Sequence, residues 1–192
     1  MTTQTGIAHS YREKLATNRL GLWLFILSDS FVFGGLLVSR FYLLGTQSRP
    51  HLDQVVGFVV TAVLLASSFF MNRAEIGMAH GDRKAFLRNT AITLVLGIAF
   101  LVGVVGVEWQ IAPFGTADGA AASIFYTLTG FHAFHVLTGV IFLAVVLRNG
   151  ARGLYSPEKH WAVEAAAVYW HFVDVVWIFF YPALYLIGTP LP

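Results

Sequence analysis

A histidine and an aspartate lie three residues apart in the last long apolar stretch, within the sequence Tyr-Trp-His-Phe-Val-Asp-Val-Val-Trp of residues 169–177. Side chains at this spacing share a helix face, so His171 and Asp174 can act together. Imidazole and carboxyl groups bind and release protons. A charged group in the middle of a bilayer costs about 2.5–3.5 kcal/mol on insertion scales. We therefore expect both side chains to be paired or functional.

Three other apolar stretches carry polar groups of the same kind. Asp29 lies between two serines in the first, Glu108 lies near the outer end of the third, and His132 and His135 lie three residues apart in the fourth. Asp29 and His135 are about 14 Å and about 20 Å from the inner ends of their helices, close enough in depth to hydrogen-bond if those helices are neighbours. The candidate buried polar or proton-linked residues are Asp29, Glu108, His132, His135, His171 and Asp174.

The sequence favours different roles for these six residues. For His132, His171 and Asp174 it favours hydrogen bonds between helices. For Asp29 and His135, structural pairing and proton transfer are both open. Glu108 is near enough to the interface that we expect solvent to satisfy it.

The pairs His132/His135 and His171/Asp174 could alternatively bind a metal ion, because helix bundles can bind metals through residues at i and i+3. Two helices alone make such a site weakly supported, and large aromatic residues surround both pairs. The sequence therefore predicts no metal site and no catalytic residue in this chain. It also has no glycine-rich phosphate-binding motif. Several of its glycines lie in apolar stretches, where they favour close helix packing; these are Gly34, Gly35, Gly97, Gly103, Gly106 and Gly139.

The composition indicates a membrane protein. Hydrophobic residues make up 57% of the 192 residues, charged residues make up 11%, and cysteine is absent. A soluble domain carries about 25% charged residues. We predict an all-α integral membrane protein, with residues 1–19 as an N-terminal cytoplasmic segment and residues 20–192 as a single five-helix transmembrane bundle. The expected spans, each near the length of about 20 residues that a bilayer requires, are 20–44, 55–79, 86–107, 120–147 and 163–187.

The basic residues predict the orientation of this bundle. Five spans put Arg40 and Arg49 on one side and ten other basic residues on the opposite side, which places the N-terminus in the cytoplasm and the C-terminus in the periplasm. The ten are Arg12, Lys14, Arg19, Arg73, Arg83, Lys84, Arg88, Arg148, Arg152 and Lys159. Guanidinium groups bind phosphate through paired hydrogen bonds. We therefore expect Arg19, Arg88, Arg148 and Arg152 to bind phospholipid headgroups, with simple anchoring of the helix ends as the alternative.

Two motifs of the chain resemble those of a known family. Residues 125–139 read Phe-Tyr-Thr-Leu-Thr-Gly-Phe-His-Ala-Phe-His-Val-Leu-Thr-Gly, and residues 164–177 end in Tyr-Trp-His-Phe-Val-Asp-Val-Val-Trp. Together with residues 79–83 and 107–119, they resemble subunit III of haem-copper terminal oxidases, the cytochrome c oxidase subunit 3 family, in its five-helix form. The resemblance covers residues 21–188.

The resemblance implies a non-catalytic subunit of a proton-translocating oxidoreductase complex. Such a subunit docks on the catalytic subunit I beside subunit II, binds phospholipid and supports proton uptake, while haem and copper reside in the partner subunits. Longer family members have seven helices, and this chain matches the last five. Five-helix forms occur in bacterial oxidases, which implies a multi-pass protein of the bacterial inner membrane. The acid at Asp29 resembles the quinol-oxidase form, whereas residues 164–177 resemble the cytochrome c form, so the electron donor is open.

Two alternatives accompany this interpretation. The Tyr-Pro pair at residues 181–182 also resembles the accessory subunit of nitric oxide reductases. A small proton-coupled transporter would need a polar path, which Asp29, His135 and Asp174 could line. Co-purification with a haem-containing partner distinguishes an oxidase subunit from a transporter.

Overall fold

The computed structural model describes residues 2–191, with side chains described from residue 14. Five long helices form the bundle. In chain order the elements are α1 (Thr2–Leu44), β1 (Ser48–Arg49), α2 (Gln54–Ala79), α3 (Arg83–Leu101), the π-helix η1 (Val102–Glu108), α4 (Trp109–Ile111), α5 (Gly119–Ala151), α6 (Trp161–Tyr181), the π-helix η2 (Pro182–Leu186) and β2 (Thr189–Pro190).

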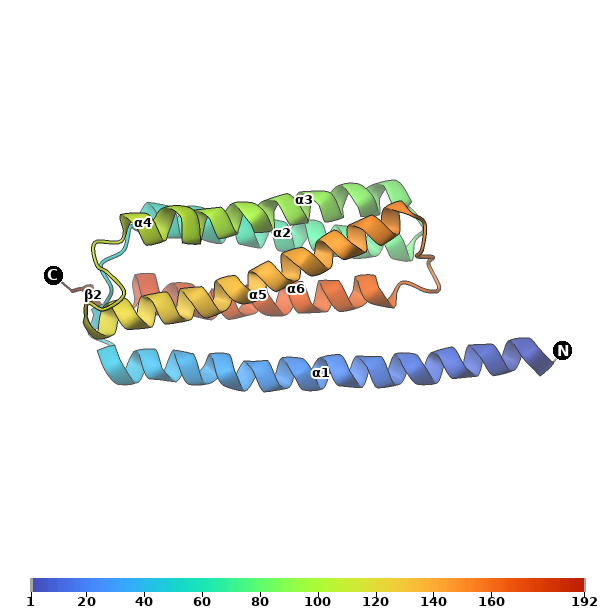
Figure 1. The fold of residues 1–192 in the computed structure, drawn as a ribbon, viewed down its shortest axis with the longest axis horizontal. Coiled ribbons are helices and arrows are strands. Elements are labelled where there is room, and N and C mark those ends of the chain that lie inside the picture. The colour runs from blue at the N-terminus through green and yellow to red at the C-terminus, as the bar shows by residue number, and fades with distance from the viewer. Residues whose placement is uncertain (1, 192) are drawn as a thin grey trace.

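The helices form a bundle with α1 at one edge (Figure 1). The α2 and α3 helices pack along each other, α3 also packs on α5, and α6 packs on both α2 and α5. Among the described residues, α1 packs mainly on α5 and α6, and it carries many exposed apolar side chains. Each long helix is apolar enough and long enough to cross a membrane, which confirms the predicted class of five-span helical membrane protein.

Local interactions fix the ends of several helices. The Asp53 carboxylate accepts hydrogen bonds from the first backbone N–H groups of α2, at 2.8 Å and 3.0 Å, and Asp82 accepts one from Ala85 of α3 at 2.9 Å. Between these helices Gly81 has φ +76°, a conformation that favours glycine. The Arg83 guanidinium donates to the carbonyls of Gly150 and Ala151, at 3.2 Å and 2.7 Å, and so caps the end of α5.

Some predicted boundaries differ from the observed ones. The α1 helix begins at Thr2 and passes residue 19 without a break, and its membrane-spanning candidate segment is Lys14–Leu44. The third span continues to Ile111 because η1 and α4 extend the helix beyond the predicted end at residue 107. The cytoplasmic placement of residues 1–19 stays a prediction, and Met1 and Pro192 lie outside the described residues.

The glycine prediction is confirmed where α6 packs on its neighbours. A Cβ atom at Gly97 would lie 2.5 Å from the Trp170 ring, and one at Gly139 would lie 2.9 Å from it. The helices α3 and α5 can therefore approach this tryptophan of α6 only because these two positions lack a side chain. Gly34 and Gly35 on α1 differ, because a Cβ there would meet no atom within 4 Å in the described chain beyond the neighbouring backbone of α1 itself.

Arg40, one of the two basic residues expected on the outer side, has a fully buried side chain. It donates to the carbonyls of Ala183 at 2.6 Å, Ser48 at 2.9 Å and Ile187 at 2.9 Å, and also to that of Gly45. Carbonyl groups in the last turn of a helix have no hydrogen-bond partner within that helix and carry partial negative charge, so they attract a cation. One guanidinium thus joins the ends of α1 and η2 beside the parallel β1–β2 pair.

Candidate functional site

Asp29 of α1 and His135 of α5 form the predicted contact between helices. His135 Nε2 lies 3.1 Å from Asp29 Oδ2, and His135 Nδ1 lies 2.8 Å from the Phe131 carbonyl. A carbonyl oxygen only accepts, so Nδ1 carries a hydrogen. The hydrogen bond between Nε2 and the carboxyl group then holds one further proton, on either partner. The pair is therefore a unit that shares a proton between two helices.

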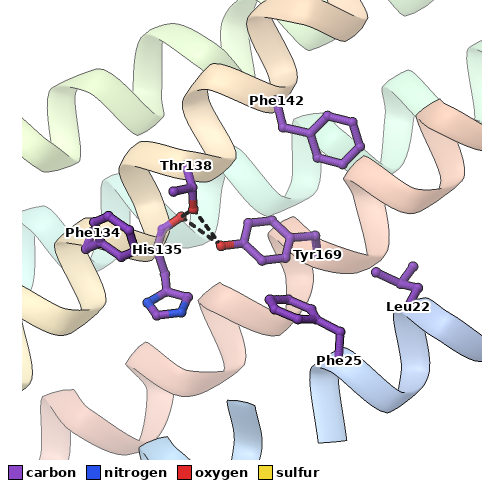
Figure 2. Close-up of a pocket in the computed structure, with 7 residues that line it drawn as sticks. All are labelled: Leu22, Phe25, Phe134, His135, Thr138, Phe142 and Tyr169. Carbon is purple, nitrogen blue, oxygen red and sulfur yellow. Dashed lines mark hydrogen bonds between the residues drawn. The ribbon is translucent and has the colours of Figure 1, made fainter. Parts of the chain in front are cut away.

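An apolar groove of about 410 Å³ lies beside this pair, between α1, α5 and α6. Figure 2 shows Leu22 and Phe25 entering it from α1, Tyr169 from α6 and the other lining residues from α5. The Tyr169 hydroxyl lies 2.7 Å from Thr138 Oγ1 and donates to the His135 carbonyl at 3.2 Å. The groove thus has apolar walls and one polar side next to the proton-sharing pair.

The expectation for Glu108 was wrong, because solvent does not reach it. Its side chain is 1% exposed, one carboxylate oxygen accepts from the Tyr185 hydroxyl, and Oε2 is enclosed without a hydrogen bond within the described residues. Gly57 of α2 permits this, since a side chain there would overlap the Tyr185 ring. Two π-helices, η1 and η2, supply the carboxylate and the phenol.

His132 does not make the hydrogen bond between helices that the sequence favoured. It is fully buried, and neither ring nitrogen has a partner among the described residues. The rings of Trp177 and Phe100 lie around it, with centroids 4.8 Å and 5.6 Å away. His132 therefore packs against aromatic rings, and these rings offer its ring nitrogens no hydrogen bond.

His171 and Asp174 lie on the α6 face that meets α2, but His171 binds a serine rather than the aspartate. His171 Nδ1 is 2.6 Å from Ser68 Oγ, a hydrogen bond between helices as expected. Asp174 is 3% exposed, and neither of its oxygens makes a hydrogen bond of good geometry within the described residues, although Ser68 lies beside it. Ser68 is therefore the neighbour that the two residues share.

The two pairs considered as metal ligands do not gather. Among the side chains that the structure describes, from residue 14 on, no three histidine, cysteine, aspartate or glutamate residues are arranged to hold a metal ion. The geometry of the described chain thus gives no support to the metal alternative.

The arginines expected to bind lipid differ in their surroundings. Arg19 pairs with Glu164 at 2.8 Å and lies 5.8 Å from the centre of the Trp161 ring, so it joins α1 to α6. Three of the arginines, Arg88, Arg148 and Arg152, are exposed at one end of the bundle. None of their side chains has a hydrogen bond or ion pair with another described side chain. They are the basic side chains of this set that remain open to a headgroup.

Sequence reasoning missed the partners that complete these sites. Ser68, Tyr185 and Arg40 carry no spacing pattern that distinguishes them from other residues of their helices. Tyr169 belongs to the motif around His171, yet its hydroxyl reaches the turn that carries His135. These contacts depend on helix packing, which no local sequence pattern reveals.

The fold and these sites define a class: a polytopic helical membrane protein with buried acid and imidazole groups. A sequence model of cytochrome c oxidase subunit III matches residues 6–189. Cytochrome c oxidase subunit 3 of Gadus morhua is 39% identical over 184 residues, covering 89% of this chain and 70% of that protein. The proteins of the same name from Cyprinus carpio and Scyliorhinus canicula are each 38% identical over the same shares.

The chain therefore belongs to the cytochrome c oxidase subunit III family, which confirms the resemblance found in its motifs. This membership associates the five apolar helices with a membrane protein of respiratory electron transport.

Proposed function

We propose that this chain is the non-catalytic subunit III of a respiratory haem-copper oxidase of the cytochrome c oxidase type. It stabilises the catalytic subunit, binds phospholipid and supports proton uptake. The observation that carries the proposal is the family match over residues 6–189, which includes all five spans. The cytochrome c type is supported by the names of the similar fish proteins.

The proposed partners are oxidase subunits I and II, which hold the haem and copper, together with membrane phospholipid. The chain itself contributes proton-linked and structural groups rather than redox chemistry. Asp29 and His135 share a proton beside an apolar groove, and this geometry supports a role in holding or passing protons at the surface of the catalytic subunit. Glu108, His132, His171 and Asp174 are proposed as further buried groups of this kind.

The proposed topology places the N-terminus in the cytoplasm and the C-terminus in the periplasm of a bacterial inner membrane. The charge asymmetry supports this orientation, and burial of Arg40 leaves even fewer exposed basic groups at the outer end. The bacterial location rests on the five-helix form, since the similar proteins named above come from fish. Reporter fusions at residue 117 and at the C-terminus should both read as periplasmic, and a cytoplasmic reading at either would overturn the topology.

The nitric oxide reductase, quinol oxidase and transporter alternatives are not favoured. The family match and the named relatives all concern cytochrome c oxidase. A purified complex tests the choice directly, because its absorption spectrum and co-eluting chains identify the haems and the electron donor.

The decisive measurement is oxygen consumption by the oxidase with and without this chain. We expect the complete complex to retain its rate over more turnovers, because proton supply from the cytoplasm limits an enzyme that reduces oxygen to water. The isolated chain should consume no oxygen. Identical initial rates and identical inactivation in the two preparations would refute the supporting role.

A further inference from the structure

His160 lies between a backbone carbonyl and a carboxylate, just before α6, at the end of the bundle that the proposed topology places in the cytoplasm. Its Nδ1 is 3.2 Å from the Ser156 carbonyl oxygen, and its Nε2 is 3.4 Å from Glu164 Oε1. A carbonyl oxygen and an ionised carboxylate can only accept a hydrogen bond. The imidazole ring therefore faces an acceptor on each side.

A neutral imidazole ring carries one hydrogen, so only one of its two nitrogens can donate. With the hydrogen on Nδ1, the lone pair of Nε2 faces the Glu164 carboxylate. With the hydrogen on Nε2, the lone pair of Nδ1 faces the Ser156 carbonyl. Only the protonated ring presents a hydrogen to both oxygens. The geometry therefore fits the positively charged form of His160, and histidine is the side chain that gains and loses this charge between pH 5 and pH 8.

Glu164 connects this ring to α1. Its Oε2 is 2.8 Å from Arg19 Nη2, and the Arg19 guanidinium lies 5.8 Å from the centre of the Trp161 ring. One carboxylate thus contacts a cation of α1 with one oxygen and the histidine before α6 with the other. We call Arg19, His160 and Glu164 the clasp.

Further charged groups surround the clasp. Glu75 of α2 is half-buried and acts electrostatically on both His160 and Glu164, while Glu158 of the preceding loop acts on His160. Lys159 precedes the histidine in the chain. Loss of the imidazole proton removes one cation from a group that contains three carboxylates. The neutral ring therefore leaves an excess of negative charge around Glu164.

The clasp lies at one mouth of the apolar groove between α1, α5 and α6. Leu22, one helical turn after Arg19, lines this groove together with Tyr169 of α6 (Figure 2). Towards the middle of the bundle, the contact between Asp29 and His135 fixes α1. Since α1 packs on the other helices over a small area, the position of its inner end depends strongly on the clasp.

We propose that the clasp is a pH-dependent device that holds the inner end of α1 against α6 while His160 is protonated and releases it when the proton leaves. The proton stabilises the closed form, so the closed form is favoured at low pH and is lost as the pH rises through the range in which histidine titrates. Leu22 moves with α1, so release widens the mouth of the groove. This regulation goes beyond the proposed function and does not depend on it.

Distances between spin labels test the movement in the purified complex. The chain has no cysteine, so Asn18→Cys on α1 and Ala151→Cys at the end of α5, both exposed, accept one label each. We expect the distance between the two labels to be several ångströms longer at pH 8 than at pH 5. Labels at the opposite ends of the same helices, Tyr42→Cys and Ala120→Cys, should keep their distance. An unchanged distance between positions 18 and 151, or an equal change in both label pairs, would overturn the proposal.

Substitutions then assign the movement to the clasp. His160→Gln should remove the dependence on pH, because glutamine does not titrate. The matched control is His80→Gln, which removes an exposed histidine from the same end of the bundle and should leave the response intact. Glu164→Gln should give the longer distance at both pH values, because it removes the carboxylate that joins the two cations. A response to pH that persists in His160→Gln would assign the movement to another group and overturn the proposal.

Nitrogen magnetic resonance tests the protonation itself. In the complex carrying ¹⁵N-labelled histidine in this chain, the signal that disappears in His160→Gln identifies His160 among the seven histidines. We expect both ring nitrogens to carry a hydrogen at pH 5 and one of them to lose it by pH 8, in the same range as the change in distance. A neutral ring at both pH values would contradict the clasp. Failure of the unaltered chain to co-purify with an oxidase would refute the proposed function, whereas these readouts test the clasp alone.

Discussion

At the scale of single residues, the buried polar groups fall into satisfied and unsatisfied sets. Asp29 and His135 complete each other, whereas Glu108, His132 and Asp174 keep at least one enclosed atom without a hydrogen bond within the described residues. A buried polar group that loses its partner costs about 1–3 kcal/mol. Substitutions at these positions can therefore distinguish groups that stabilise the fold of this chain from groups that act in the assembled oxidase.

Removal of the Tyr185 hydroxyl should destabilise the chain. Tyr185→Phe keeps the ring against Gly57 but leaves the buried Glu108 carboxyl without its one donor, so we expect a loss of about 1–3 kcal/mol. Thermal unfolding of the purified chain in detergent measures the change. Tyr42→Phe is the matched control, since Tyr42 is 86% exposed and has no hydrogen bond in the described chain. Equal melting temperatures of the two variants would show that the hydroxyl is not needed.

The Asp29 carboxyl group should matter for proton-coupled turnover. Asp29→Asn keeps the size of the side chain but cannot share a proton with His135, and hydrogen bonds to charged groups contribute about 1.5–3 kcal/mol. We expect the assembled oxidase to turn over more slowly and to inactivate sooner. Asp118→Asn makes the same chemical change in an exposed loop and should have no effect. Unchanged turnover and complex stability in Asp29→Asn would reduce the pair to packing.

At the scale of elements, α1 is held by polar contacts at three levels. Arg19 pairs with Glu164 near one end, Asp29 bonds His135 in the middle, and Arg40 joins the opposite end to η2. Much of the apolar surface of α1 stays exposed. Polar contacts therefore fix the register of a helix that packs on the bundle over a small area (Figure 1).

Loss of Arg40 should loosen the C-terminal segment. Arg40→Met leaves the carbonyls of Ala183 and Ile187 without this donor, and we expect a cost of at least about 3 kcal/mol. Hydrogen exchange of residues 182–191 should become faster. Arg40→Lys should be intermediate, because an ammonium group lacks the fork that reaches several carbonyls. The control is Arg73→Met, a change at the other end of the bundle, which should leave this hydrogen exchange unchanged. Unchanged exchange in Arg40→Met would show that the guanidinium is dispensable.

The sequence predicted elements better than contacts. Uninterrupted apolar runs predicted the number and approximate bounds of the five helices, because a bilayer imposes a minimum length on each. The similar depths of Asp29 and His135 also predicted their contact. The burial of Glu108 and Arg40 was missed, because it depends on how η2, which continues α6, packs beside η1, α2 and the end of α1. No local pattern encodes that packing.

At the scale of the whole molecule, one end of the bundle gathers basic side chains that no other described side chain engages. Arg88 extends from α3, and Arg148 and Arg152 extend from the end of α5, which packs on α3. Arg83, by contrast, caps α5 and is not available. The two helices thus present guanidinium groups at one level, where phospholipid phosphates lie under the proposed topology.

Bound phospholipid should therefore depend on Arg148. Each basic residue near an anionic membrane surface contributes about 1 kcal/mol, so Arg148→Ala should retain about fivefold less lipid in native mass spectrometry of the purified complex. Arg148→Lys keeps the charge but loses the paired hydrogen bonds of the guanidinium, so its retention measures how far recognition depends on that geometry. Retention in Arg148→Ala equal to that of the unaltered chain would show that these residues only anchor the helix ends at the membrane surface. A loss in Arg148→Ala that Arg148→Lys restores would assign the binding to charge alone, and a loss in both would assign it to the guanidinium fork.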